Sequence, residues 1–137
     1  MAQAKREIQR LVRQIVIIRD GHCVLRGVPL KNGNGCSEVK QAHHLITRGK
    51  NIGYADTRLI VLICSAHHSA ITWATGEDKR QYDILIQKKI GADRSKLLAR
   101  AEKDTKSYPM GIYEWNREIM ALSEELKKAK LLSNKQK

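Results

Sequence analysis

The segment "RLIVLICSAHHSA" (residues 58–70) changes from an apolar run to a polar stretch that carries two histidines. The run over residues 58–64 is apolar, β-branched and of strand length, which predicts a buried strand. Ser65 is a suitable N-cap, so we expect a short helix to follow it and to end at Gly76. The segment therefore predicts a strand that leads directly into a helix.

Cys64 and His67 stand at C-x-x-H spacing across this junction. A thiolate at the end of a strand and an imidazole in the first helical turn can reach one ion, and zinc accepts both ligands. His68 follows one residue later and is rotated by about 100° around the helix. We therefore expect His68 to face a different site, on the side of the helix turned toward the hairpin.

A second histidine doublet lies upstream, in "QAHHLITRG" (residues 41–49). We expect a short strand over residues 39–46 and a loop over residues 48–56, which gives the order strand, loop, strand, helix. Adjacent residues of a strand point to opposite faces, so His43 and His44 should not bind one ion side by side. One of them can ligate a metal while the other meets a water or a substrate.

Residues 24–38 are rich in glycine and contain no apolar period that would define a core element. A metal bound by Cys23 and Cys36 would hold this loop in place. The chain has three cysteines and no visible signal peptide, which fits a reducing compartment. There, clustered Cys and His indicate a metal more often than a disulfide. We interpret His22 as a turn residue.

The chain of 137 residues is predicted to form a single domain, residues 1–137. We expect a basic N-terminal helix at 3–18, a central unit at 19–76, helices across 77–132 and a frayed tail at 133–137. Trp73, on the short helix, is expected in the core. A heptad-like seam near the C-terminus should pack against the domain, although it could also pair two copies of the chain. The seam consists of Ile112, Trp115, Ile119, Leu122 and Leu126.

Lys and Arg number 26 and Asp and Glu only 14, so the formal net charge is +12. This excess predicts a polyanionic partner, most often nucleic acid. The chain has no Phe and two Trp, which favours contact with duplex phosphates over stacking on single-stranded bases. No apolar run reaches 18 residues, so we expect no membrane span and no membrane partner.

The stretches "AHHLI" (42–46) and "LICSAHH" (62–68) resemble two signatures of the HNH nucleases, also called ββα-metal or His-Me finger nucleases. The resemblance covers about residues 19–76 and is closest to compact phage-type members. It implies an α+β, mostly helical fold, with a ββα-metal core flanked by N-terminal and C-terminal helices. It also implies a metal-dependent DNA endonuclease that leaves a 5′-phosphate and a 3′-hydroxyl.

By this resemblance His44 is the general base, and His43 and His68 are ligands of a catalytic divalent ion. We expect that ion to be Mg²⁺ or Mn²⁺, with Zn²⁺ or Ni²⁺ as alternatives, and we expect no small-molecule cofactor. Cys64 and His67 match half of a structural zinc site, and Cys23 matches the first cysteine of the other half. By count, Cys36 supplies the fourth ligand, so the predicted zinc ligands are Cys23, Cys36, Cys64 and His67.

Two positions depart from the family pattern. Arg26 stands where the partner of Cys23 should be, and Leu59 stands where a central Asn should orient the general base. The family Asn could be replaced by a backbone carbonyl or by one of three side chains. These are Asn51, Asp56 and Arg58.

The expected partner is double-stranded DNA in the cytoplasm of a bacterial or phage-infected cell. Basic residues beside the doublets and on the first helix are the expected phosphate contacts, namely Arg48, Lys50, Arg58, Arg10 and Arg13. Two other functions stay open. The absent Asn favours a non-catalytic DNA-binding module that is stabilised by zinc. Alternatively, the four His and three Cys could form zinc sites for protein–protein contact.

Overall fold

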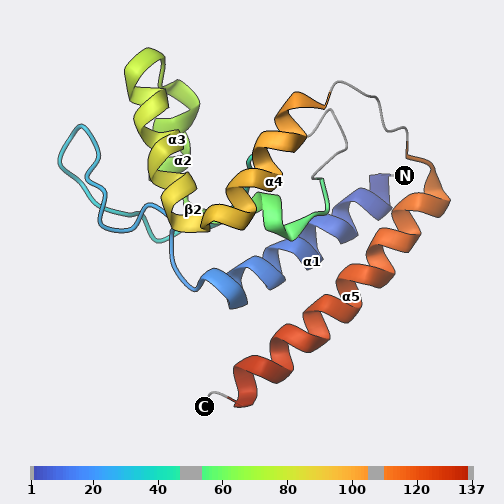
Figure 1. The fold of residues 1–137 in the computed structure, drawn as a ribbon. Helices are drawn as coiled ribbons and strands as arrows, with labels where there is room; N and C mark the ends of the chain where they lie inside the picture. The colour runs from blue at the N-terminus through green and yellow to red at the C-terminus, as the bar shows by residue number, and fades with distance from the viewer. Residues whose placement is uncertain (1, 47–53, 105–109, 136–137) are drawn as a thin grey trace.

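A computed structural model describes residues 2–46, 54–104 and 110–135. Within these residues the fold is α+β and mostly helical, as predicted, with a two-stranded antiparallel sheet (Figure 1). The strands and the helix that follows them occur in the order β, β, α. The elements are α1 (Ala2–Asp20), β1 (Lys40–His44), the 3-10 turn η2 (Thr57–Leu59), β2 (Ile60–Cys64), α2 (Ser65–Trp73), α3 (Gly76–Ile90), α4 (Ala92–Lys103) and α5 (Ile112–Lys135).

Strand β2 is buried on both faces, which explains its unbroken apolar sequence. Ile60 and Leu62 belong to one hydrophobic cluster, whereas Val61 and Ile63 belong to a second cluster on the opposite face. The alternation of side chains along a strand produces this division. The prediction of a buried strand is confirmed, and β2 separates two helical layers.

The first layer consists of α1 and α5, which lie side by side and run in the same direction (Figure 1). The apolar stripe predicted on α1 is buried, and it packs against Trp115, Leu122 and Leu126 of α5. The predicted seam therefore packs within the domain, although Ile112 at its start is 54% exposed. A dimer through α5 would have to use other side chains of that helix.

The second layer covers the opposite face of β2 and consists of α3, α4 and part of the loop that follows α1. Ile86 and Ile90 of α3 and Leu98 of α4 are buried there. Gly91 connects the two helices with a φ of 90°, a left-handed conformation that glycine adopts without steric cost. This layer closes over the same face of the sheet that carries His43.

The register of the sheet fixes which face each histidine occupies. His44 pairs with Ile60 and His43 pairs with Val61, and directly paired residues share a face. His44 therefore lies on the α1–α5 side and His43 on the α3–α4 side. The outer edge of β2 is covered as well, because the Val24 N–H donates to the Leu62 carbonyl at 2.7 Å.

Several predicted boundaries move by a few residues. Strand β1 spans Lys40–His44 rather than 39–46. The predicted strand 58–64 begins only at Ile60, because the Asp56 side chain accepts from the Arg58 N–H and caps η2 instead. At the other end of the chain, α5 continues to Lys135, so the predicted tail 133–137 is helical through that residue.

Helix α2 differs from its prediction at both ends. Its N-cap is Cys64 rather than Ser65, since the Cys64 sulfur accepts from the His67 N–H. The helix ends at Trp73 instead of reaching Gly76. Trp73 itself is 84% exposed, so the expectation that it lies in the core is wrong. No helix among the described residues has both the length and the apolar character needed to cross a membrane.

Candidate metal centre and histidine cluster

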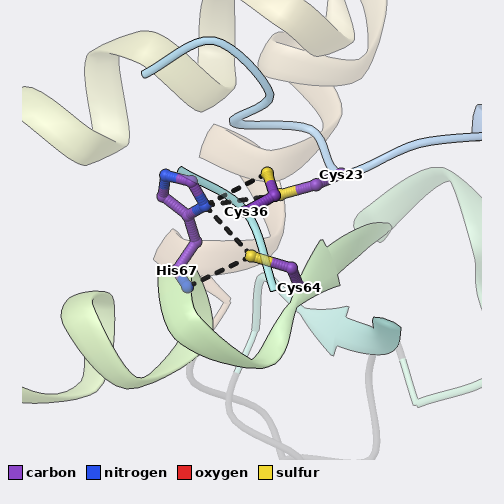
Figure 2. Close-up of side chains that lie close together, drawn as sticks. All are labelled: Cys23, Cys36, Cys64 and His67. Atoms are coloured by element: carbon purple, nitrogen blue, oxygen red, sulfur yellow. Dashed lines mark hydrogen bonds between the residues drawn. The ribbon is translucent and has the colours of Figure 1, made fainter. Parts of the chain in front are cut away.

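The structure brings together all four predicted zinc ligands, Cys23, Cys36, Cys64 and His67 (Figure 2). Their ligand atoms all lie within 4.8 Å of one another. Two of the residues come from the loop after α1, one from the end of β2 and one from the first turn of α2. A Cys3His set is typical of a structural zinc site, so the donor chemistry is compatible with zinc.

The spacing of these atoms also fits a tetrahedral ion. The Nδ1 of His67 lies 3.8 Å from the sulfur of Cys23, 3.6 Å from that of Cys36 and 3.1 Å from that of Cys64. Bonds of about 2.3 Å to sulfur and about 2.1 Å to nitrogen would place a tetrahedral S···N pair about 3.6 Å apart. The cluster therefore needs only a small adjustment to hold zinc.

The carbonyl oxygen of Val28 fixes the orientation of the His67 ring. It accepts a hydrogen bond from Nε2 of His67 at 2.8 Å. Nε2 must carry the proton in this bond, so Nδ1 keeps its lone pair and directs it toward the three sulfurs. A histidine that ligates a metal through one nitrogen commonly donates from the other in this way.

The three thiols influence one another's ionisation. Burial raises the pKa of Cys64, but hydrogen bonding to His67 and Ser37 outweighs it and lowers that pKa to about 6. Burial and the charge of Cys64 raise the pKa of Cys23. Burial and hydrogen bonds to Cys23 and Cys64 raise the pKa of Cys36 to about 12. One thiolate thus forms readily while the others need a nearby cation, as expected of a metal site.

Ser37 holds the loop against α2 and so positions the neighbouring Cys36. Its hydroxyl lies 2.8 Å from the Ser65 hydroxyl and accepts from the Ala66 N–H at 3.0 Å. The Ser65 N–H donates to the Val39 carbonyl at 2.8 Å, which extends the same contact. Sequence reasoning missed Ser37, and its position directly after a candidate ligand was the only available signal.

The loop after α1 explains how four ligands come together although Arg26 stands where the family has a second cysteine. The Arg26 N–H donates to the Cys23 carbonyl at 3.0 Å, which closes a turn, while the Arg26 side chain is exposed. Gly27 follows with a φ of 88°, which redirects the chain. The turn places no side chain of residue 26 in the cluster, and Cys36 reaches it from the far end of the loop. Cys36 is exposed, whereas the other three ligands are buried.

His68 meets His43 on the other side of α2. The ring centroids of His43 and His68 are 5.1 Å apart, and the ring planes are inclined at 69°. Two imidazoles that bind one ion through bonds of about 2.1 Å would place their ring centroids about 5 Å apart. Burial, followed by the charges of His68 and His44, lowers the pKa of His43 to about 4, so its ring is neutral at pH 7. The pair can therefore share an ion.

His44 is held on the opposite face of β1 by a backbone carbonyl. Its Nε2 lies 3.0 Å from the carbonyl oxygen of Tyr54, the geometry of an Nε2–H donor. Tyr54 is buried, its hydroxyl accepts from Gln9 at 3.1 Å, and its ring meets Trp115 at 5.2 Å. The Tyr54 carbonyl thus holds the His44 ring, while Leu59, at the position of the family Asn, is buried in the core.

The side chains considered as replacements for the family Asn do not make this contact. Asp56 forms an ion pair with Arg58 and caps η2. Asn51 lies outside the described residues. The geometry therefore agrees with the remaining alternative, a backbone carbonyl.

His44 lines two hollows, and His43 lines one of them. A cleft of about 450 Å³, here called the histidine cleft, lies beside His43 and His44 and is also lined by Thr72, Asp83 and Glu102. A smaller hollow of about 220 Å³ lies between α1 and β1. His44 lines this hollow as well, together with Gln9, Arg13, Gln41 and other residues. His44 is therefore open to a ligand from the α1 side.

The predicted phosphate contacts have differing surroundings. Arg10 pairs with Glu7 on the exposed face of α1, and Arg58 pairs with Asp56. Arg13 reaches the Lys40 carbonyl at 3.5 Å and lines the α1–β1 hollow. Arg48 and Lys50 lie outside the described residues. Of the five, Arg13 is the one that the structure places next to a candidate site residue.

The sequence predicts no ligand role for His22 or for Trp73. His22 is exposed, and its Nδ1 lies 3.0 Å from the Cys23 carbonyl, as expected of a turn residue outside the metal cluster. Trp73 instead lines an open groove with Leu30 and Tyr82.

No family model, curated protein or solved structure matches this chain. The resemblance to HNH nucleases therefore rests on residues 42–46 and 62–68 and on the β, β, α order that carries them. The Cys3His cluster stands independently of that resemblance, because its four ligand atoms converge in space.

Proposed function

We propose that the chain is a metal-dependent DNA endonuclease of the HNH type, whose ββα core is stabilised by a structural zinc. The observation that carries the proposal is the arrangement of three histidines around the end of β1. His43 meets His68 on one face of the strand, and a backbone carbonyl holds His44 on the other. A protein that used zinc only for stability would have no need of these three histidines in addition to the zinc ligands.

His44 acts as the general base. Its Nε2–H is directed to the Tyr54 carbonyl, so the unprotonated Nδ1 is the atom that can take a proton from water. The ring is partly exposed and lines the hollow beside Arg13, which gives water and a phosphate a path to it. The Tyr54 carbonyl also orients the ring, because Tyr54 is anchored by Gln9 and Trp115.

His43 and His68 would hold a divalent ion through their ring nitrogens. When bound, such an ion supplies positive charge against the phosphate and the leaving 3′ oxygen. The depressed pKa of His43 keeps its ring neutral near pH 7, which is the state that a metal ligand requires. The histidine cleft beside His43 is lined by the carboxylates of Asp83 and Glu102, which would favour a cation, and by the ammonium group of Lys79.

The net charge of +12 supports DNA as the substrate, because neutralising phosphates with Lys and Arg supplies most of the affinity for duplex DNA. Arg13 is the basic side chain best placed to bind a phosphate beside His44, since both line one hollow. Zinc at Cys23, Cys36, Cys64 and His67 would fix the loop after α1 to the β2–α2 junction.

The proposal is tested by a plasmid-nicking assay with zinc-loaded protein and added Mg²⁺, Mn²⁺, Zn²⁺ or Ni²⁺. We expect wild-type protein to relax supercoiled plasmid and EDTA to stop it. His44→Ala should lower the rate by at least about 100-fold, the usual contribution of a general base, while zinc content and melting temperature stay unchanged. Lys88→Gln, at an exposed position of α3 that lines neither histidine hollow nor the metal cluster, is the control and should cleave like wild type. Equal rates for His44→Ala and wild type would refute the assigned role of His44.

The second candidate is a zinc-stabilised DNA-binding module without catalysis. One observation favours it: among the described residues, the Cys3His cluster is the only group of three or more side chains placed to hold a metal. This candidate predicts one tightly bound zinc per chain, salt-sensitive DNA binding and no cleavage with any of the four ions. Metal analysis combined with the nicking assay separates the two functions.

A further inference from the structure

A basic hollow of about 220 Å³ lies at the outer edge of β2; His22 is part of its wall, whereas His43, His44 and His68 do not line it. We call it the arginine hollow. Three cationic side chains line it, Arg19 from the end of α1, Lys89 from the last turn of α3 and Arg94 from the first turn of α4. Asp20 is the one carboxylate in its wall, so cations outnumber anions there.

Two of the cations converge on one acceptor. Nη2 of Arg19 and Nη2 of Arg94 both donate to the carbonyl oxygen of Ile60, at 2.6 Å and 3.0 Å. The two guanidinium groups therefore approach each other closely, and like charges at such a separation repel. Burial and the charge of Arg19 lower the pKa of Arg94, which reflects the same conflict. Only Arg19 has a bidentate partner, Asp20.

A purely structural role explains part of this arrangement. Arg19 also donates to the Thr57 carbonyl and Arg94 to the Arg58 carbonyl, so both side chains satisfy backbone oxygens near the start of β2. This role does not use Nη1 of Arg94, which has no acceptor in the part of the chain that the structure describes. It also does not involve Lys89, which forms no ion pair with any described residue.

We propose that the arginine hollow is a binding site for a phosphate group, held by Arg94 and Lys89 beside the Arg19–Asp20 pair. A phosphate offers several acceptor oxygens, which match the spare guanidinium donors and the ammonium group of Lys89. Its negative charge would also relieve the repulsion between the two arginines. The site does not depend on the proposed nuclease activity. The phosphate can belong to a DNA backbone or be a free anion.

The test compares Lys89→Gln with Lys88→Gln in the full-length, zinc-loaded protein. The two variants lose the same charge from adjacent exposed positions of α3, but only Lys89 lines the hollow. Inorganic phosphate is titrated against chloride at equal ionic strength, and NMR follows the Nε–H resonance of Arg94. We expect Lys89→Gln to weaken phosphate binding by about three- to tenfold, the effect of one lost ionic contact. Lys89→Arg should restore it, and Lys88→Gln should match wild type.

A second arm measures binding to a short DNA duplex across a range of salt concentrations. If the phosphate is part of a DNA backbone, Lys89→Gln lowers the slope of log affinity against log salt by about one, and Lys88→Gln does not. If only inorganic phosphate binding weakens, the site takes a free anion. Equal effects of Lys89→Gln and Lys88→Gln in both arms would show diffuse charge attraction and overturn the proposal. Neither arm requires cleavage, so a failure of the nuclease proposal would be seen separately.

Discussion

The Nε2 of His67 donates a hydrogen bond to the Val28 carbonyl at 2.8 Å, and this bond turns Nδ1 of the same ring toward three cysteine sulfurs. The contact joins the first turn of α2 to the loop after α1. It orients the ring before any metal binds, because its acceptor is a backbone atom. Helix α2, which also carries His68, is thus connected to the loop through His67.

We expect His67→Ala to lose the bound zinc and to destabilise the protein. The ring is fully buried, and the loop has few apolar contacts of its own to compensate. A loss of about 3 kcal/mol or more would lower the melting temperature by roughly 10 °C in a chain of this size. Atomic-emission analysis of zinc and a thermal melt give the two measurements. His22→Ala should keep one zinc per chain, and a zinc affinity of His67→Ala equal to that of wild type would exclude His67 as a ligand.

Cys36→Ser should weaken zinc binding without abolishing the fold. Cys36 is the exposed ligand, and the three buried ligands remain in place to hold the ion with a water. Since losing an outer-shell partner already costs about 10- to 100-fold in affinity, losing a ligand should cost more than about 100-fold. Competition with a chromophoric chelator measures the affinity, and circular dichroism in excess zinc checks the fold. An unchanged affinity would mean that another residue supplies the fourth ligand.

The stability of the protein should fall in mild acid because of His43. Burial, then the charges of His68 and His44, lower its pKa from 6.5 to about 4, so the unfolded chain binds the proton more tightly than the folded one. His43 contributes fully to the free energy of unfolding above about pH 6.5, where its ring is neutral in both states. This contribution to the free energy of unfolding is lost as the pH falls toward 4. Between pH 7 and pH 5 this loss amounts to about 2 kcal/mol.

Urea unfolding at these two pH values, without added divalent ions, measures the effect. His43→Gln should show a smaller loss of stability on acidification than wild type, because its side chain does not titrate. The control His22→Gln should lose as much as wild type. If His43→Gln and wild type lose equal amounts, the acid sensitivity arises elsewhere.

Trp115→Ala should destabilise the protein by about 3–5 kcal/mol, the usual cost of removing a large aromatic side chain from a core. The ring is 1% exposed, meets Tyr54 at 5.2 Å and lies under the Lys5 ammonium group at 5.4 Å. Met120→Ala, on an exposed position of the same helix, should change stability by less than about 0.5 kcal/mol. Urea unfolding of both variants checks this, and similar losses would show that α5 is not anchored at Trp115.

If Trp115 anchors Tyr54, its removal should also impair nicking under conditions where the variant is still folded, because the carbonyl that orients His44 is then less well fixed. The nicking rate of Trp115→Ala, measured well below its melting temperature, tests this consequence. A wild-type rate would mean that Tyr54 keeps its position without the contact.

The sequence could predict the elements whose signals are local. Strand β2 and helix α2 follow from an apolar run that ends at Cys64, and the C-x-x-H spacing identifies His67 directly. Cys36 could be assigned only by counting ligands, because a glycine-rich loop has no period from which its path can be derived. The structure brings it to the cluster through Ser37, whose hydrogen bonds join segments about 30 residues apart in the chain.

Two features could not be predicted from the sequence for different reasons. The contact between His44 and Tyr54 uses a backbone carbonyl, an atom that every residue possesses, so no residue type signals it. The composition of cores predicts a buried Trp73, because most tryptophans are largely buried, yet it stands at the last residue of α2 and is 84% exposed. Its exposure depends on where the helix stops, which is the least predictable property of a helix.

The pairing of α1 with α5 has a consequence for the order in which the protein can fold during synthesis. A ribosome makes α1, with its buried stripe of apolar side chains, about a hundred residues before it makes Trp115, Leu122 and Leu126. The β2–α2 junction and its metal ligands are complete well before that point. The nascent chain therefore carries a finished central unit beside a helix whose apolar face still lacks its main cover. During that interval the uncovered part of the apolar face of α1 is open to aggregation and to chaperones.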